Sequence, residues 1–204
     1  MKRNTWLIFA LIMTSLAGSG CRISANFHEV DKGKYYRSAQ LTGEELDQVI
    51  PNLGIRTIIS LRGGNPGDAW FDEEVAVAEK HGAKVVPIGM SAKRLPHRHS
   101  LIKLLDTFRD AERPILVHCL AGADRTGEAT AIYMMEYMGK SKKKALSALS
   151  PRYLHIPISK PAKRYFIRQY QGQDWAYNTY DPCVQSYKYY DKAAYCEAEP
   201  ASAN

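Results

Sequence analysis

The chain has 204 residues, of which 45% are hydrophobic and 24% are charged, a balance typical of one soluble packed domain with a leader and a tail. A formal net charge of +7 favours anionic partners by long-range steering but does not identify them. Because the sequence has no zinc-finger spacing and no RNA-binding motif, we expect no nucleic-acid partner.

Residues 1–21 have the layout of a bacterial secretion signal. A basic start precedes an apolar stretch, Trp6–Leu16, that is too short to span a membrane comfortably, and small residues follow it. Cys21 stands where a lipoprotein signal places its lipidated cysteine, so we expect a periplasmic or cell-envelope protein attached to the membrane through Cys21. Two features leave it open whether Cys21 is lipidated. Gly18 stands where such signals usually have Leu, and cleavage after Ala25 would remove Cys21.

Beyond the leader, short apolar runs alternate with amphipathic stretches. We expect a strand and turn over residues 35–40, strands over 55–61, 84–90 and 115–117, and helices over 42–53, 70–81, 100–110, 126–138, 141–149 and 160–171. Thr42 and Glu45, three residues apart, predict a capping box at the first helix. The alternation predicts an α/β fold with a central, mostly parallel sheet flanked by helices. We place the main domain at residues 27–172 and a tyrosine-rich tail at 173–204.

The cysteines also favour export. Cys21 belongs to the leader, Cys119 belongs to a motif near the middle of the chain, and Cys183 and Cys196 lie in the tail. In an oxidising compartment, two remaining cysteines that close a short loop most simply form a disulfide. The alternative is a pair of free thiols.

One segment, residues 117–127 (Val-His-Cys-Leu-Ala-Gly-Ala-Asp-Arg-Thr-Gly), has the features of a phosphate-binding loop. It lies between a predicted strand and a predicted helix, and the strand delivers it to the carboxyl edge of the sheet, where α/β proteins bind ligands. Gly122 allows successive amides to turn inward as an anion-binding nest, and the helix N-terminus adds partial positive charge. Arg125 can grip two phosphate oxygens. The residues expected to bind phosphate are Leu120, Ala121, Gly122, Ala123, Asp124 and Arg125.

The same positive potential favours the thiolate of Cys119, which is the nucleophilic form of this side chain. The thiolate would attack phosphorus and form a phosphocysteine that water then hydrolyses. Thr126 can donate a hydrogen bond to the departing sulfur, and we expect His118 to orient the loop rather than to transfer protons. This chemistry needs no metal and no cofactor, and the sequence contains no metal-binding constellation.

The pattern Val-His-Cys-x5-Arg-Thr-Gly resembles the signature of the protein tyrosine phosphatase superfamily. The chain is most similar to bacterial dual-specificity-type members and to inositide-directed members with Cys-x-Ala-Gly-x-Asp-Arg-Thr-Gly loops. Residues 36–40 and 60–63 resemble upstream segments of such bacterial proteins, so the resemblance covers residues 35–149. It implies a phosphatase fold and hydrolysis of phosphomonoesters, with phosphotyrosine, phosphoproteins, inositol phosphates or phosphoinositides as substrates.

The sequence departs from this family at the general acid. Dual-specificity phosphatases usually carry an aspartate in the loop after the strand that precedes the catalytic one, but residues 91–99 contain no carboxylate. Asp124 is the candidate replacement, because it resembles an aspartate that is proposed as the acid in phosphoinositide phosphatases of the myotubularin kind. Asp68 and Asp72 are alternatives, and a helix N-cap is the other role open to Asp124.

Basic side chains complete the candidate site. Lys93 and Arg94 belong to a loop that would draw anionic substrates to the rim, or they are simply solvated. Arg62 and Arg37 are expected either to support the catalytic loop by hydrogen bonding or to pair at the surface.

Two other functions stay open at this point. A phosphate-binding module without turnover is favoured by the missing loop aspartate. A rhodanese-like sulfurtransferase also presents a cysteine in an amide nest, although the residues around Cys119 fit phosphate better. The sequence does not indicate the oligomeric state.

Overall fold

A computed structural model describes residues 25–196 of the chain. The leader expected over residues 1–21, with its Cys21, lies outside the described residues, as does the end of the tail after residue 196. Within the described part, no helix has the length and apolar character needed to cross a membrane.

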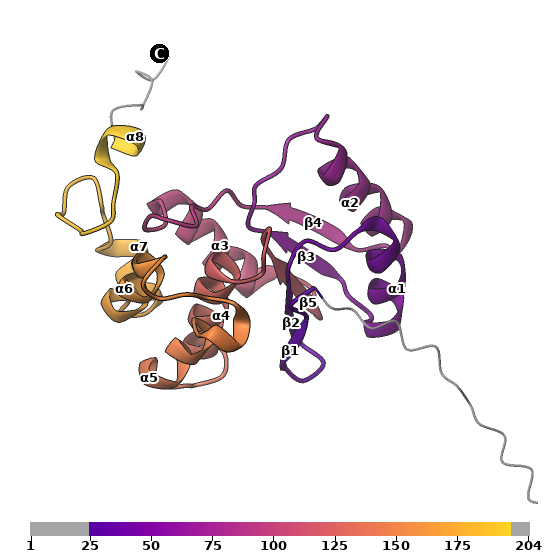
Figure 1. The fold of residues 1–204 in the computed structure, drawn as a ribbon, viewed down its shortest axis with the longest axis horizontal. Coiled ribbons are helices and arrows are strands. Elements are labelled where there is room, and N and C mark those ends of the chain that lie inside the picture. Colours follow the sequence, from indigo (N-terminus) through magenta and orange to yellow (C-terminus); the bar gives the residue numbers. More distant parts are fainter. Residues whose placement is uncertain (1–24, 197–204) are drawn as a thin grey trace, which may run out of the picture.

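The strands of the described residues form one sheet with the motif at its centre. They are β1 (His28–Asp31), β2 (Tyr35–Ser38), β3 (Thr57–Ser60), β4 (Lys84–Pro87) and β5 (Ile115–His118). Their order is β1-β2-β5-β3-β4, in which β1 is antiparallel to β2 and the other neighbours are parallel. The mostly parallel sheet is thus confirmed, and β5, which leads into the motif, is the middle strand (Figure 1).

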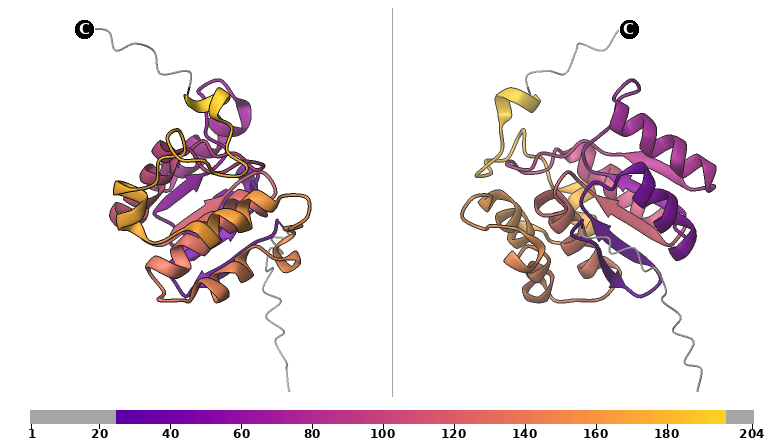
Figure 2. Two further views of the ribbon diagram at one scale, coloured as in Figure 1. Left: turned by 90° about the vertical axis from the view of Figure 1, so that its left-hand side faces the viewer. Right: turned by 45° about the vertical axis from the view of Figure 1, so that its right-hand side comes forward.

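Helices cover both faces of this sheet. They are α1 (Gly43–Leu53), α2 (Ala69–Lys80), α3 (Arg98–Asp110), α4 (Asp124–Glu136), α5 (Lys142–Ala145), α6 (Pro161–Gln169), α7 (Gln173–Asn178) and α8 (Lys192–Cys196), with 3-10 turns η1 (Leu146–Ala148) and η2 (Pro151–Tyr153). Helices α1 and α2 lie on one face and α3 and α4 on the other, where α6 and α7 pack on them (Figures 1 and 2).

Successive side chains of the strands point to opposite faces of the sheet and form a hydrophobic core on each face. Ile58 and Leu116 pack toward α1 and α2, whereas Ile59 and Val117 join the core on the α3 and α4 side. Because both faces are covered, the central strands β3 and β5 are largely apolar runs, which is why the sequence indicates them.

Local signals set the ends of two important helices. The side chain of Thr42 accepts a hydrogen bond from the Glu45 N–H, and the Glu45 carboxylate accepts one from the Thr42 N–H, which confirms the capping box. Gly54 ends α1 in the left-handed conformation, at φ 64°. Helix α4 begins two residues earlier than predicted, so Asp124 and Arg125 lie in its first turn.

The structure corrects two expectations about secondary structure. Strand β1 lies in a mostly polar stretch for which no strand was predicted, and its sequence, His-Glu-Val-Asp, has a single apolar residue and so no apolar alternation. The single helix predicted over residues 141–149 is α5 followed by η1. This tighter 3-10 turn places the carbonyl of Ala148 where it accepts a hydrogen bond from Arg37 at 3.0 Å.

The segment expected as a tail packs on the main core. Trp175 of α7 and Tyr180 are buried in the same cluster as the residues of α4, and the Tyr180 hydroxyl donates to the Pro96 carbonyl at 2.7 Å. The disulfide predicted between Cys183 and Cys196 is present. The segment is therefore fastened to the loop between β4 and α3.

A buried ion pair joins α4 to α6. The Nζ atom of Lys163 lies 2.8 Å from Oε2 of Glu128, both side chains are fully buried, and Lys163 also donates to the Arg94 carbonyl at 2.7 Å. Burial raises the pKa of Glu128 to about 7, although Lys163 acts in the opposite direction. The pair thus connects α4, α6 and the loop between β4 and α3.

We expect Lys163→Met to lower the free energy of unfolding by about 3–5 kcal/mol, because it leaves an unpaired carboxylate in the interior. Replacing both partners, Glu128→Met with Lys163→Met, should cost much less, since no buried charge remains. Urea unfolding of the three proteins measures the difference. A double variant less stable than Lys163→Met alone would contradict this explanation.

Candidate active site

The motif forms the loop that leaves the central strand at its carboxyl end. It follows His118, the last residue of β5, and enters α4 at Asp124. Cys119 is 2% exposed and is the free cysteine of the described residues. Of the residues expected to bind phosphate, Gly122 and Ala123 are buried, those at positions 120 and 121 are exposed, and those at positions 124 and 125 are part-exposed. The partial positive charge at the N-terminus of α4 acts directly on this loop.

Gly122 packs against the end of β2. Its φ is 65°, and a Cβ atom there would lie 2.6 Å from backbone atoms of Ser38 and Ala39. Glycine is required for the left-handed backbone and again for the close approach of two main chains. The shape of the loop therefore depends on β2.

Arg37 of β2 supports the loop through hydrogen bonds to backbone carbonyls. Its buried guanidinium donates from Nη2 to the Gly122 carbonyl at 2.7 Å and from Nη1 to the Ala148 carbonyl at 3.0 Å. It also lies over the Tyr153 ring, 4.1 Å from the centroid. Burial lowers the pKa of Arg37, and its attraction to Cys119, among other groups, opposes this. Arg37 is thus a buried cation that supports the loop near Cys119.

Arg125 and Thr126 offer donors inside the site. The Nη1 atom of Arg125 donates to the carbonyls of Leu61, at 3.1 Å, and Met90, at 3.5 Å, which fixes the guanidinium. Among the described residues, neither Nε of Arg125 nor Oγ1 of Thr126 has a hydrogen-bond partner, and both atoms are buried. Such buried donors are rare in folded proteins. Arg125 can donate to a phosphate oxygen, and Thr126 to a sulfur.

His118 contacts groups behind the loop. Its Nε2 lies 2.9 Å from Oε2 of Glu74 in α2, and both side chains are almost completely buried. Gln40 donates to the same carboxylate oxygen at 2.7 Å and accepts from Nη1 of Arg62 at 3.0 Å. The Gln40 N–H also donates to the Leu120 carbonyl at 3.2 Å. Arg62 thus reaches the catalytic loop through Gln40.

Asp124 has a partner that the sequence did not reveal. Its Oδ1 lies 2.7 Å from Nδ1 of His155, which is fully buried, while the Asp124 side chain is 18% exposed. The Nε2 atom of His155 has no partner among the described residues. The short contact between Nδ1 and Oδ1 therefore joins Asp124 to a buried side chain that follows η2.

The other candidate side chains lie at the rim or beyond it. Lys93 is exposed, and the guanidinium of Arg94 pairs with Asp191 of the tail segment at 2.9 Å. Asp72 accepts a hydrogen bond from a backbone N–H of its own loop at 3.0 Å, and Asp68 is exposed at the start of α2. Asp124 alone of the three candidate carboxylates belongs to the catalytic loop.

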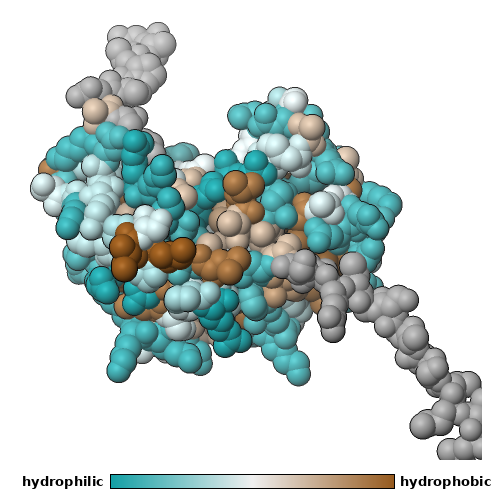
Figure 3. Space-filling model, in the orientation of Figure 1, coloured by the Kyte–Doolittle hydropathy of each residue, from teal (hydrophilic) through white to brown (hydrophobic). Residues whose placement is uncertain are grey.

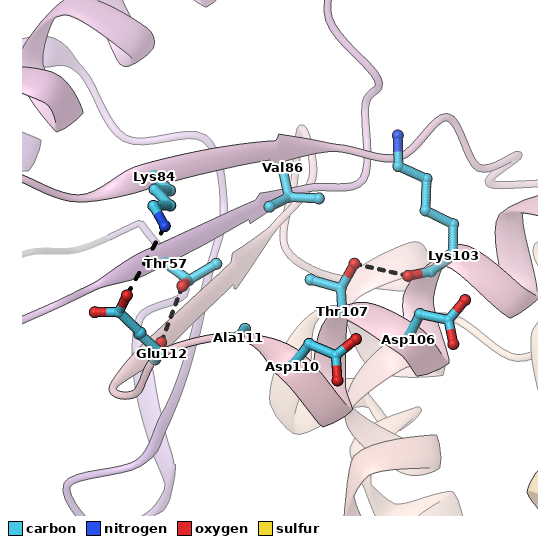
Figure 4. Close-up of a pocket in the computed structure, with 9 residues that line it drawn as sticks. All are labelled: Thr57, Lys84, Val86, Lys103, Asp106, Thr107, Asp110, Ala111 and Glu112. Carbon is cyan, nitrogen blue, oxygen red and sulfur yellow. Dashed lines mark hydrogen bonds and ion pairs between the residues drawn. The ribbon is translucent and has the colours of Figure 1, made fainter.

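A cavity of about 310 Å³ lies at the opposite edge of the sheet (Figure 4). It is lined by Thr57, Lys84, Val86, Lys103, Asp106, Thr107, Asp110, Ala111 and Glu112. Thr57 and Lys84 begin β3 and β4, whereas the catalytic loop follows the end of β5. Three carboxylates make this cavity a poor place for a phosphate.

Glycine substitutions test the packing of the loop. We expect Gly122→Ala to destabilise the protein more than Gly139→Ala, because Gly139 has a similar φ of 60° but open space around it. The cost at Gly139 should be roughly 1–2 kcal/mol of backbone strain. Urea unfolding of both variants gives the comparison, and equal losses would show that the contact with β2 is unimportant.

Solved structures share this fold. TpbA of P. aeruginosa is 22% identical and covers 72% of this chain and 86% of its own, with a TM-score of 0.58. The core catalytic domain of PP-IP phosphatase SIW14 from S. cerevisiae, solved with citrate, is 24% identical over 72% and 85% of the two chains, with a TM-score of 0.58. A putative phosphatase from Shewanella putrefaciens is 14% identical over 71% and 88%, with a TM-score of 0.56.

Sequence comparison identifies the family. No curated protein sequence matches the chain. The model of the family described as DSP-PTPase phosphatase fused to NAD+ kinase matches residues 21–160, which is more than half of the chain and includes the whole catalytic loop. The chain therefore belongs to this family and is a phosphatase of the protein-tyrosine/dual-specificity type.

Proposed function

We propose that this phosphatase is exported and hydrolyses phosphomonoesters through a phosphocysteine on Cys119. The observation that carries the proposal is the pair of unpartnered buried donors, on Arg125 and Thr126, in the loop that begins at this free cysteine. Arg125 suits a phosphate oxygen and Thr126 suits a sulfur. A phosphocysteine mechanism uses both in every turnover.

The reaction proceeds in two displacements at phosphorus. The Cys119 thiolate attacks phosphorus, and the bond from phosphorus to the leaving oxygen breaks. Water then attacks the phosphocysteine, and the phosphorus–sulfur bond breaks while the Thr126 hydroxyl donates to the departing thiolate. Arg125 and the N-terminus of α4 stabilise the charge on the phosphoryl oxygens in both steps.

Asp124 supplies the proton. In the first step its carboxylic acid protonates the leaving oxygen, and in the second the carboxylate accepts a proton from the attacking water. His155 positions the Asp124 carboxyl through the 2.7 Å contact between Nδ1 and Oδ1. Its burial keeps the Asp124 side chain in one orientation.

The substrate classes to consider come from the site and from its structural relatives. TpbA has been solved in complex with pTyr, and SIW14 is described as a PP-IP phosphatase. Phosphotyrosine, phosphoproteins, inositol phosphates and phosphoinositides are therefore the candidates. Their phosphate group would meet Arg125, with Lys93 at the exposed rim.

The proposal of export and membrane attachment is based on the leader. Residues 1–21 have the layout of a secretion signal, and Cys21 is the proposed lipidation site of a periplasmic or cell-envelope protein. The disulfide between Cys183 and Cys196 supports an oxidising compartment.

Replacing the nucleophile separates an enzyme from a binding module. Cys119→Ser should abolish turnover of an aryl phosphate, because serine is a far weaker nucleophile in this loop. The matched control, Cys183→Ser with Cys196→Ser, should keep turnover, since it leaves the catalytic loop unchanged. Release of the aryl alcohol is measured. A wild-type protein that binds phosphate without turnover would instead favour the module, and thiosulfate activity would favour a sulfurtransferase.

Leaving-group dependence tests the acid. Asp124→Asn should slow hydrolysis of an alkyl phosphate by roughly 10²–10⁴-fold and of an aryl phosphate with a good leaving group much less. His155→Ala should show the same selectivity to a smaller extent, which a general structural defect would not produce. Steady-state rates on both esters provide the readout. Equal losses on the two esters would exclude Asp124 as the acid.

A further inference from the structure

An aliphatic surface lies beside the catalytic loop. It comprises Leu120 of that loop and Leu154, Ile156 and Ile158 of the segment between η2 and α6, and we call these four residues the aliphatic rim. They are 61%, 64%, 61% and 94% exposed. Figure 3 shows apolar surface along this segment, across the middle of the visible face. Exposed aliphatic side chains that gather on one face of a protein often mark an interaction surface.

The inner side of this segment is fastened to the active site. His155 is buried against Asp124, while its neighbours on both sides are exposed. The Asn26 side chain donates to the carbonyls of Ala121 and Tyr153, both at 3.1 Å. The aliphatic rim is therefore held next to the entrance of the catalytic loop.

The N-terminal part of the chain enters the domain at this same place. The carbonyl of Ala25 accepts from the Ala39 N–H at 2.7 Å, and Asn26 makes the two contacts just described. Cys21 is four residues before Ala25, and an extended chain of that length spans at most about 14 Å. A lipid on Cys21 would hold the catalytic loop and the aliphatic rim against the bilayer.

Basic residues accompany the aliphatic rim. Arg152 precedes the segment and is exposed, and Lys160 follows it and is part-exposed. Aliphatic side chains next to cations are suited to the interface of a membrane that contains anionic lipids.

We propose that this face docks on an anionic lipid bilayer and that the substrate is a phosphomonoester lipid in that bilayer. The inference rests on the proposed phosphatase function and names its substrate class. The aliphatic rim enters the interfacial layer, and the headgroup phosphate meets Arg125 and Cys119. A protein partner is less suitable, because a lipid on Cys21 would turn this face toward the membrane.

Vesicle binding tests the docking surface. The exported chain with Cys21→Ser, which carries no lipid, is mixed with phosphatidylcholine vesicles with and without phosphatidylglycerol, and sedimentation measures the bound fraction. We expect stronger binding to the anionic vesicles and a loss of about tenfold or more in Ile156→Ser with Ile158→Ser. Val184→Ser, at a 79% exposed position of the tail segment, is the matched control and should bind normally. Equal binding by all three proteins, or no binding, would overturn the proposal.

Hydrolysis gives the second measurement. The same double variant should hydrolyse a soluble aryl phosphate at the wild-type rate but act at least about tenfold more slowly on phosphatidylinositol phosphates in the vesicles. A loss seen with phosphotyrosine peptides instead, with vesicle binding unchanged, would identify a protein-docking surface and overturn the proposal. If the wild-type chain hydrolyses no aryl phosphate, the proposed function fails, while vesicle binding still judges the docking surface independently.

Discussion

The close approach of Gly122 to the end of β2 sets the geometry on which the rest of the site depends. Two main chains meet there at a distance that leaves no room for a Cβ atom, and Arg37 fastens the same glycine by its carbonyl. The parallel pairing of β2 with β5 fixes where that contact falls. Arg37 therefore has two effects on the loop. Its hydrogen bond fixes the Gly122 carbonyl, and its buried positive charge is attracted to Cys119.

Three buried or half-buried polar pairs surround this contact and fix the loop from different sides. Their members are Glu74 with His118, Lys163 with Glu128, and His155 with Asp124. Each costs desolvation and is tolerated only when both partners are present. Together they leave the catalytic loop little freedom, so its donors are already in place for an anion and need no costly reordering. The pairs that hold the loop rigid therefore also hold its hydrogen-bond donors in position for the proposed chemistry.

The sequence predicted the elements and the loop well because their signals are local. The capping box at Thr42, the apolar strands and the spacing from Cys119 to Arg125 are each contained in a few neighbouring residues. His155 and Glu74 could not be found this way, since each is distant in sequence from its partner and becomes significant only through the folded contact. Strand β1 was missed for another reason: its four residues, His-Glu-Val-Asp, include a single apolar side chain, so no alternation is visible.

In the proposed mechanism, the phosphoryl group passes through the sulfur of Cys119. Rapid acid quench during turnover of an aryl phosphate, followed by mass spectrometry of the peptides, tests this most directly. We expect a phosphoryl group on the peptide that contains Cys119, and more of it in Asp124→Asn, because hydrolysis of the intermediate loses its base. Turnover with no phosphorylated Cys119 peptide at any time would contradict it and would favour direct attack by water.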